Sequence, residues 1–108
     1  NFTAVNCAVG IKANNRAIIS IDASDGFEIS SRNSGVRSSD QTFTNLSSGE
    51  RFGISSSVDY GIRARGQSSV TVDVLVPPVD CEIFGLLGDT NEESASAIIS
   101  VPAGCLVQ

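Results

Sequence analysis

The chain has no histidine, methionine or tryptophan, and only one tyrosine among its 108 residues. Without histidine, Ser-His-Asp and Cys-His catalysis and imidazole metal sites are excluded. Aromatic residues make up only 6% of the composition, which disfavours the aromatic-lined substrate cleft that is typical of glycoside hydrolases. These absences predict a protein that is not an enzyme and that holds no cofactor.

Cysteine is scarce and its count is odd. Cys7, Cys81 and Cys105 include no Cys-x-x-Cys pair, which argues against a zinc or iron–sulfur site. We expect Cys81 and Cys105 to form a disulfide, because both lie in the β-rich tail and closing that loop would stabilise the fold by roughly 3 kcal/mol. Cys7 lies between Val5 and Val9 on the apolar face of an expected strand, which favours burial as a small hydrophobe over a bridge to another chain.

Basic residues are missing from the last part of the chain. The formal net charge is −5, all seven bases precede Gly66, and every charged residue after it is acidic. Such a run is usually a solvated face. The alternative is a patch that meets arginines of a neighbouring copy, and the candidate assembly residues are Arg63, Arg65, Glu92 and Glu93. The pI of about 4.4 disfavours a nucleic-acid partner.

Long hydrophobic runs are also missing, so no membrane span is expected. The length suits one β-rich domain over residues 1–108. A first residue of Asn in a chain without methionine indicates a processed, secreted or surface-displayed protein. Sequons at Asn1 and Asn45 would permit glycosylation there.

What the sequence does contain is period-two alternation of apolar and polar residues, interrupted by Gly, Asn, Asp and Ser. Residues 2–12 and 16–22 predict a hairpin, residues 52–64 one long bent strand, and residues 70–76 the clearest strand. Because the connections are too short for crossover helices, we expect antiparallel pairing. The predicted fold is a single antiparallel β-sandwich, immunoglobulin-like or jelly-roll-like, and no internal repeat is evident.

The tail supports two interpretations. Alternation over residues 81–86 and 95–101 predicts strands, whereas Thr90-Asn91-Glu92-Glu93 has the form of a capping box and predicts a short helix near residues 91–100. Oxygen-bearing side chains also cluster here, which makes Asp89, Asn91, Glu92 and Glu93 weak calcium candidates without the full spacing of a calcium loop. A helix cap or an acidic turn explains the same residues.

The function predicted first is a structural subunit that assembles with copies of itself into a filament, surface layer or shell. Strand edges and complementary charge would supply the contacts. The alternatives are an extracellular binding module that recognises a protein or glycan through loops, and a small viral coat protein.

Overall fold

A computed structural model describes residues 2–23, 26–49, 51–74, 80–94, 96–102 and 105–107. Within these ranges the regular structure is β-strand, and the strands form three parallel sheets. The chain winds as a parallel β-solenoid of about three turns. Each circuit contributes one strand to each sheet, and we call such a trio of strands a coil.

The three sheets run along the winding. Sheet A consists of β1 (Phe2–Cys7), β4 (Gly26–Ser31), β7 (Arg51–Ser56), β10 (Asp80–Gly85) and β13 (Leu106–Val107). Sheet B consists of β2 (Ile11–Ala13), β5 (Val36–Ser39), β8 (Tyr60–Arg65) and β11 (Gly88–Glu92). Sheet C consists of β3 (Ile18–Ala23), β6 (Phe43–Ser48), β9 (Ser69–Val74) and β12 (Ile98–Ser100).

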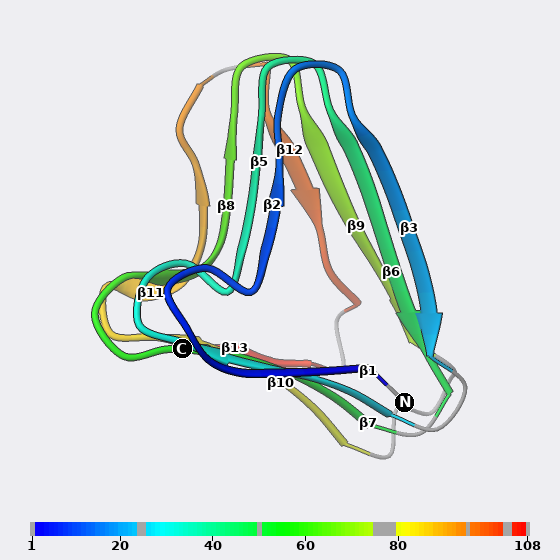
Figure 1. The fold of residues 1–108 in the computed structure, drawn as a ribbon, viewed down its shortest axis with the longest axis vertical. Coiled ribbons are helices and arrows are strands. Elements are labelled where there is room, and N and C mark those ends of the chain that lie inside the picture. Colours follow the sequence, from blue (N-terminus) through cyan, green and yellow to red (C-terminus); the bar gives the residue numbers. More distant parts are fainter. Residues whose placement is uncertain are drawn as a thin grey trace.

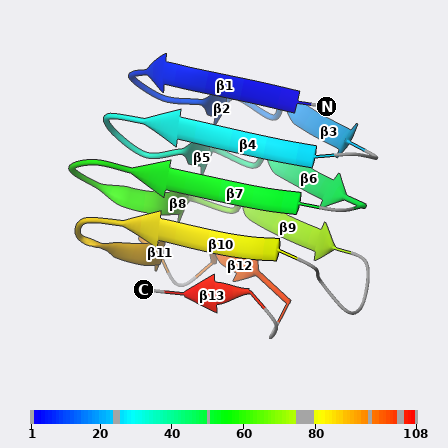
Figure 2. The same cartoon turned by 90° about the horizontal axis from the view of Figure 1, so that it is seen from below.

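The sheets enclose a wedge-shaped interior. In Figure 1 sheets B and C descend from a shared corner at the top, and sheet A closes the base. Figure 2 shows the strands of sheet A stacked in chain order from β1 to β13. We call the bend between sheets A and B the AB corner (residues 8–10, 32–35 and 57–59) and the bend between sheets B and C the BC corner (residues 14–17, 40–42 and 66–68).

The predicted antiparallel sandwich is wrong, since each strand pairing between described residues is parallel. The expected hairpin over residues 2–22 is wrong as well, because β1, β2 and β3 lie in three different sheets. The error came from the rule that parallel neighbours need a long crossover, usually a helix. Here the crossover is made of the two other strands of the coil.

The chain also has an internal repeat that the sequence prediction missed. Phe27-Glu28-Ile29-Ser30-Ser31 lies directly against Phe52-Gly53-Ile54-Ser55-Ser56 in sheet A. Gly35-Val36-Arg37 and Gly61-Ile62-Arg63 are the corresponding neighbours at the start of sheet B. The expected long strand over residues 52–64 is therefore two strands, β7 and β8, which the AB corner separates.

Inward-facing side chains stack in columns along the interior. Phe27 lies on Phe52 with ring centroids 4.7 Å apart and an interplanar angle of 7°. Beside them Ile29, Ile54 and Ile83 form an aliphatic column, each no more than 2% exposed. Because identical positions of successive coils meet at the strand spacing of ~4.8 Å, the repeat places like side chains on like and fills the core.

The helix interpretation of the tail is wrong in the described residues. Residues 88–92 form β11 beside β8, and residues 98–100 form β12 beside β9. The edges of β8 and β9 offer backbone partners that a lone capping box does not outweigh. No helix in the described part of the chain is long and apolar enough to cross a membrane.

Candidate functional site

The BC corner is built from residues that tolerate a left-handed backbone. Asn15, Asp40 and Gly66 occupy the same place in three successive coils, with φ of 58°, 63° and 68°. Asn, Asp and Gly are the residues that adopt this region at the lowest cost. The next residues, Arg16 and Gln41, also have positive φ, and both side chains are exposed to solvent.

These outward side chains form a hydrogen-bonded ladder along the solenoid. Arg16 Nε donates to Gln41 Oε1 over 3.1 Å, and Gln41 Nε2 donates to Gln67 Oε1 over 3.0 Å. The partners are 25 and 26 residues apart, which is one coil in each case. We call Arg16, Gln41 and Gln67 the corner ladder.

Two hollows flank the corner ladder. The first has a volume of about 370 Å³ and is lined by the ladder together with Asn15, Asp40 and Gly66. The second has a volume of about 410 Å³ and is lined by the ladder together with Ile18 and Phe43. Ile18 is 74% exposed and Phe43 is 54% exposed. The second hollow, called here the apolar hollow, thus has an apolar wall opposite a polar one, as ligand sites commonly do.

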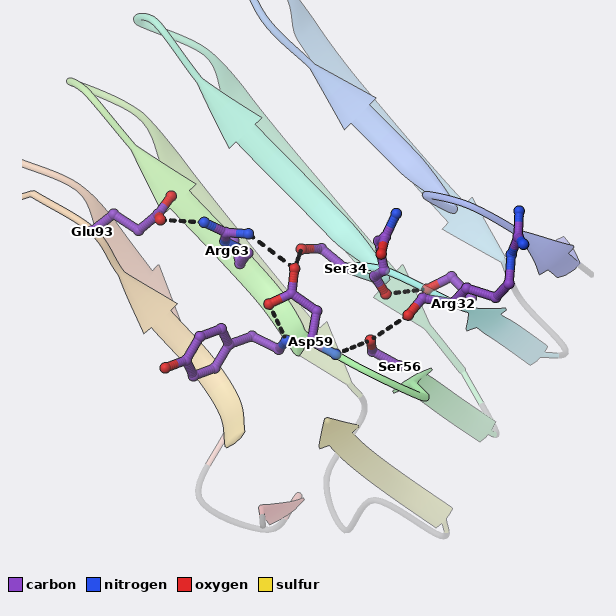
Figure 3. Close-up of polar contacts among 9 residues, drawn as sticks. Arg32, Ser34, Ser56, Asp59, Arg63 and Glu93 are labelled. Carbon is purple, nitrogen blue, oxygen red and sulfur yellow. Dashed lines mark hydrogen bonds and ion pairs between the residues drawn. The ribbon is translucent and has the colours of Figure 1, made fainter. Parts of the chain in front are cut away.

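A second polar cluster lies near the AB corner (Figure 3). Arg63 donates to Asp59 Oδ2 over 2.9 Å through one terminal nitrogen and pairs with Glu93 through the other. The hydroxyl of buried Ser34 donates to Asp59 Oδ2 over 3.2 Å, and Tyr60 N donates to Oδ1 over 2.8 Å. Side chains from three successive coils therefore meet at one carboxylate and one guanidinium, an arrangement that ties the coils together.

The two central groups of this cluster are held in their charged forms. Partial burial disfavours the Asp59 carboxylate, but hydrogen bonds from Tyr60 N and Arg63 outweigh it and lower the pKa of Asp59 below its ordinary value. The pKa of Arg63 is raised, chiefly by its hydrogen bond to Glu93 against the opposing effect of burial, with Asp59 contributing further. Because the Asp59 carboxylate and the terminal nitrogens of Arg63 are held in ion pairs, the cluster is suited to stability more than to proton transfer.

The calcium candidates do not converge. Asp89 Oδ1 accepts from Thr90 N over 2.7 Å, Glu92 Oε2 accepts from Ile99 N over 2.7 Å, and Glu93 pairs with Arg63. Asn91 lies on β11 beside Arg63 of β8. Within the described residues, no group of three or more His, Cys, Asp or Glu side chains is placed to hold a metal ion.

The candidate assembly residues have divided roles. Arg63 and Glu93 meet within one chain, so neither is free for a neighbouring copy. Arg65 and Glu92 are exposed at the side of sheet B. Assembly through these residues stays a prediction, and the intrachain pair reduces the number of charges available for it.

The cysteines are arranged as the predicted disulfide requires. The Cα atoms of Cys81 and Cys105 are 4.6 Å apart and their sulfur atoms lie within bonding distance. Cys7 is unpaired and half-buried. The expected apolar face around it is wrong, because Val5 is 48% exposed and the strand register shifts between Val5 and Cys7.

Of the two sequons, the one at Asn1 lies outside the described residues. Asn45 lies on β6 and is exposed on the outer face of sheet C, next to Ser20 and Thr71. Its side chain is therefore accessible to a modifying group.

The corner ladder was missed by sequence reasoning, although the sequence contains a trace of it. Asn15-Arg16, Asp40-Gln41 and Gly66-Gln67 each join a residue tolerant of positive φ to a long polar one. The three pairs recur at the period of the coil. Aligning them requires the repeat, and alternation within single strands does not reveal it.

No protein-family model, no curated protein and no solved structure matches the chain. Fold and side-chain geometry therefore define the class, a parallel β-solenoid with an outward polar ladder, and they carry the functional argument.

Proposed function

We propose that the chain is a non-catalytic binding module, secreted or surface-displayed, which holds an extended glycan along the BC corner. The observation that carries the proposal is the corner ladder beside exposed Ile18 and Phe43. Together they offer a polar wall over three successive coils and an apolar wall over the first two. A disulfide between Cys81 and Cys105 would suit the oxidising environment outside the cell.

A glycan fits this surface because a sugar ring is amphipathic. Its C–H face packs on aromatic and aliphatic side chains, and its hydroxyl edge takes hydrogen bonds from amides and guanidinium groups. The ladder repeats at the strand spacing of ~4.8 Å, so equivalent groups recur along the solenoid axis. An elongated polymer lying parallel to that axis can repeat the same contacts from coil to coil.

The side chains that line the apolar hollow favour binding over catalysis. They are Arg16, Ile18, Gln41, Phe43 and Gln67. None is a carboxylate, a thiol, a hydroxyl or a lysine, so this wall provides no nucleophile and no general acid. Asp40 lies in the other hollow, where it is the single carboxylate among the lining residues.

The test is binding of the chain to linear polysaccharides by calorimetry. Phe43→Ala and Gln41→Ala should each weaken binding about tenfold, which corresponds to ~1.4 kcal/mol. Thr71→Ala is the matched control, because Thr71 is an exposed polar residue on β9 outside both hollows. A wild-type chain that binds no polysaccharide, or variants that bind as tightly as wild type, would contradict the proposal.

The self-assembling structural subunit remains the second candidate, and one observation favours it. The winding turns the charge order of the sequence into an axial order. The first coil carries the bases Lys12 and Arg16 beside the acid Asp22, whereas the described charged residues of the last coil, Glu82, Asp89 and Glu92 among them, are all acidic. An acidic end that meets exposed bases at the other end would favour head-to-tail contacts.

Solution mass tests this candidate. If solenoids associate through charge, light scattering should show a larger mass at low salt than at high salt. Lys12→Glu should reduce that mass, because Lys12 is an exposed base in the first coil, the end that would meet the acidic last coil of the next copy. An unchanged monomer at both salt concentrations would remove this candidate and leave the binding proposal intact.

A further inference from the structure

The corner ladder has a fixed direction. Arg16 can only donate hydrogen bonds, because a guanidinium has no acceptor. Gln41 must therefore turn its amide oxygen toward Arg16, which leaves its nitrogen facing the next coil. Gln67 in turn presents its oxygen to that nitrogen. A single arginine at the first position thus orients both amides.

This direction leaves donors at both ends of the corner ladder. The Gln41 and Gln67 oxygens each accept one hydrogen bond along the ladder, and the donors in the ladder are Nε of Arg16 and Nε2 of Gln41. The two terminal nitrogens of Arg16 and the amide nitrogen of Gln67 have no hydrogen-bond partner among the described residues. The polar wall of the apolar hollow accordingly presents N–H groups to a ligand.

The charged residue that lines the apolar hollow is also a hydrogen-bond donor. Arg16 is the one charged residue that lines it. Asp40 lies on the opposite side of the ladder, in the other hollow. A wall of donors with one guanidinium and no carboxylate is complementary to a ligand rich in acceptor oxygens, and a carboxylate can take two parallel hydrogen bonds from Arg16.

We propose that the ligand is an acidic linear glycan, a polymer of sugars that carry carboxylates, which packs its rings on Phe43 and Ile18 and directs its acidic oxygens to Arg16 and Gln67. These two donors lie two strand spacings apart, about 10 Å along the axis. The inference rests on the proposed function, and it adds that the charge of the glycan decides recognition.

The first experiment compares three polymers of equal length by calorimetry on the full chain: a uronic-acid polysaccharide, the same polysaccharide with its carboxylates reduced to alcohols, and a neutral glucan. The acidic polymer should bind at least about tenfold more tightly than the other two. Its affinity should fall as salt is raised, because the contact with Arg16 is screened.

The second experiment uses a substitution that keeps the ladder and changes only its free end. Gln67→Glu retains an oxygen that accepts from Gln41 Nε2 but replaces the unused N–H groups with a charged oxygen. Binding of the acidic polymer should drop about tenfold or more, with little change for the neutral one. Asn45→Asp is the matched control, since it makes the same charge change on sheet C outside the hollow.

The outcomes separate the two proposals. Equal binding of the acidic and reduced polymers would overturn the acidic-glycan inference and leave glycan binding standing. An equal loss in Gln67→Glu and Asn45→Asp would also overturn it, because the effect would then be net charge alone. Failure of all three polymers to bind would overturn the proposed function itself. Unchanged melting curves of both variants establish that the fold is intact.

Discussion

The two corners that flank sheet B turn the chain in different ways. At the AB corner, Gly35 lies so close to the next coil that a Cβ there would stand 2.3 Å from Ile54 Cγ2 and 2.8 Å from the Gly61 carbonyl oxygen. At the BC corner, Asn15, Asp40 and Gly66 turn the chain through positive φ; the Asn15 and Asp40 side chains are exposed, and the nearest atom to a Cβ on Gly66 would be Asp40 N at 3.2 Å. One corner is limited by space and the other by backbone conformation.

This difference indicates which corner of the solenoid is available to bind a ligand. At the AB corner the inward space is filled by the isoleucine column, and Asp59 and Arg63 are committed to holding coils together. At the BC corner the side chains of Arg16 and Gln41 contact each other and solvent. Substitutions there should alter binding more than folding, and the reverse should hold at the AB corner.

The largest expected effect is that of Gly35→Ala. The added methyl group would overlap a buried side chain and a backbone oxygen, and overpacking of this kind costs about 3 kcal/mol or more. Gly53→Ala is the control, because no atom lies within 4 Å of a Cβ placed there. Urea unfolding measures both variants. Equal loss of stability in the two would show that the AB corner is not limited by space.

Asp59→Asn comes next and tests the ionic part of the AB corner. We expect a loss of about 1–2 kcal/mol near neutral pH, because Arg63 and Ser34 lose a charged partner that is 14% exposed. The folded pKa of Asp59 is lowered from 3.8, so its contribution is present above that pH and is lost as the pH falls through the folded value.

Urea unfolding of wild type and Asp59→Asn across acidic pH measures this dependence. The gap between the two should be constant from neutral pH down to the region of the ordinary pKa and should close below it. A gap that opens on acidification has the wrong sign and would remove Asp59 as a stabilising charge.

Gly66→Ala has a smaller expected effect and tests the BC corner. Alanine at φ of 68° should cost about 1–2 kcal/mol. Gly66→Asn should cost less, because asparagine adopts this conformation readily and already does so at Asn15. Thermal or urea unfolding compares the two. A larger loss for asparagine would mean that space, not backbone conformation, governs this corner as well.

The smallest effect on stability is expected for Gln41→Ala. Its two ladder bonds are exposed, and solvent replaces such bonds at a net cost of about 0.5–1 kcal/mol. The same variant should weaken glycan binding about tenfold, so we expect a small loss of stability together with a larger loss of affinity. A destabilisation as large as that of Gly35→Ala would show that the corner ladder holds the fold together.

Local patterns in the sequence predicted the faces of several strands correctly. Period-two alternation puts Phe52, Ile54 and Ser56 on one face of β7, and all three are buried, as are Phe27 and Ile29 on the neighbouring strand β4. Alternation of apolar and polar residues indicates which side of a strand faces the core. The same alternation is expected in a sandwich and in a solenoid. It contains no information about which strand lies alongside, so the topology was wrong.

The tail shows how a long-range partner overrides a local pattern. Thr90 and Glu93 have the spacing of a capping box, yet Thr90 pairs with Ile62 on β8 and Glu93 binds Arg63. A helix there would leave the edge of β8 unpaired and Arg63 without its second carboxylate. The competing partners are about one coil away in the chain, beyond the range of a capping pattern.

The sequence by itself determined most of the strand-forming segments, the inward faces of several of them, the exclusion of histidine chemistry and the uneven order of charge. Only the tertiary structure decided that the strands pair in parallel, that Asp59, Arg63 and Glu93 meet, and that Arg16, Gln41 and Gln67 form one ladder. The physical reason is that strand propensity and burial are local properties, whereas register between coils depends on how identical positions stack. The proposed function depends on that stacking, because the corner ladder forms only when equivalent residues of successive coils lie side by side.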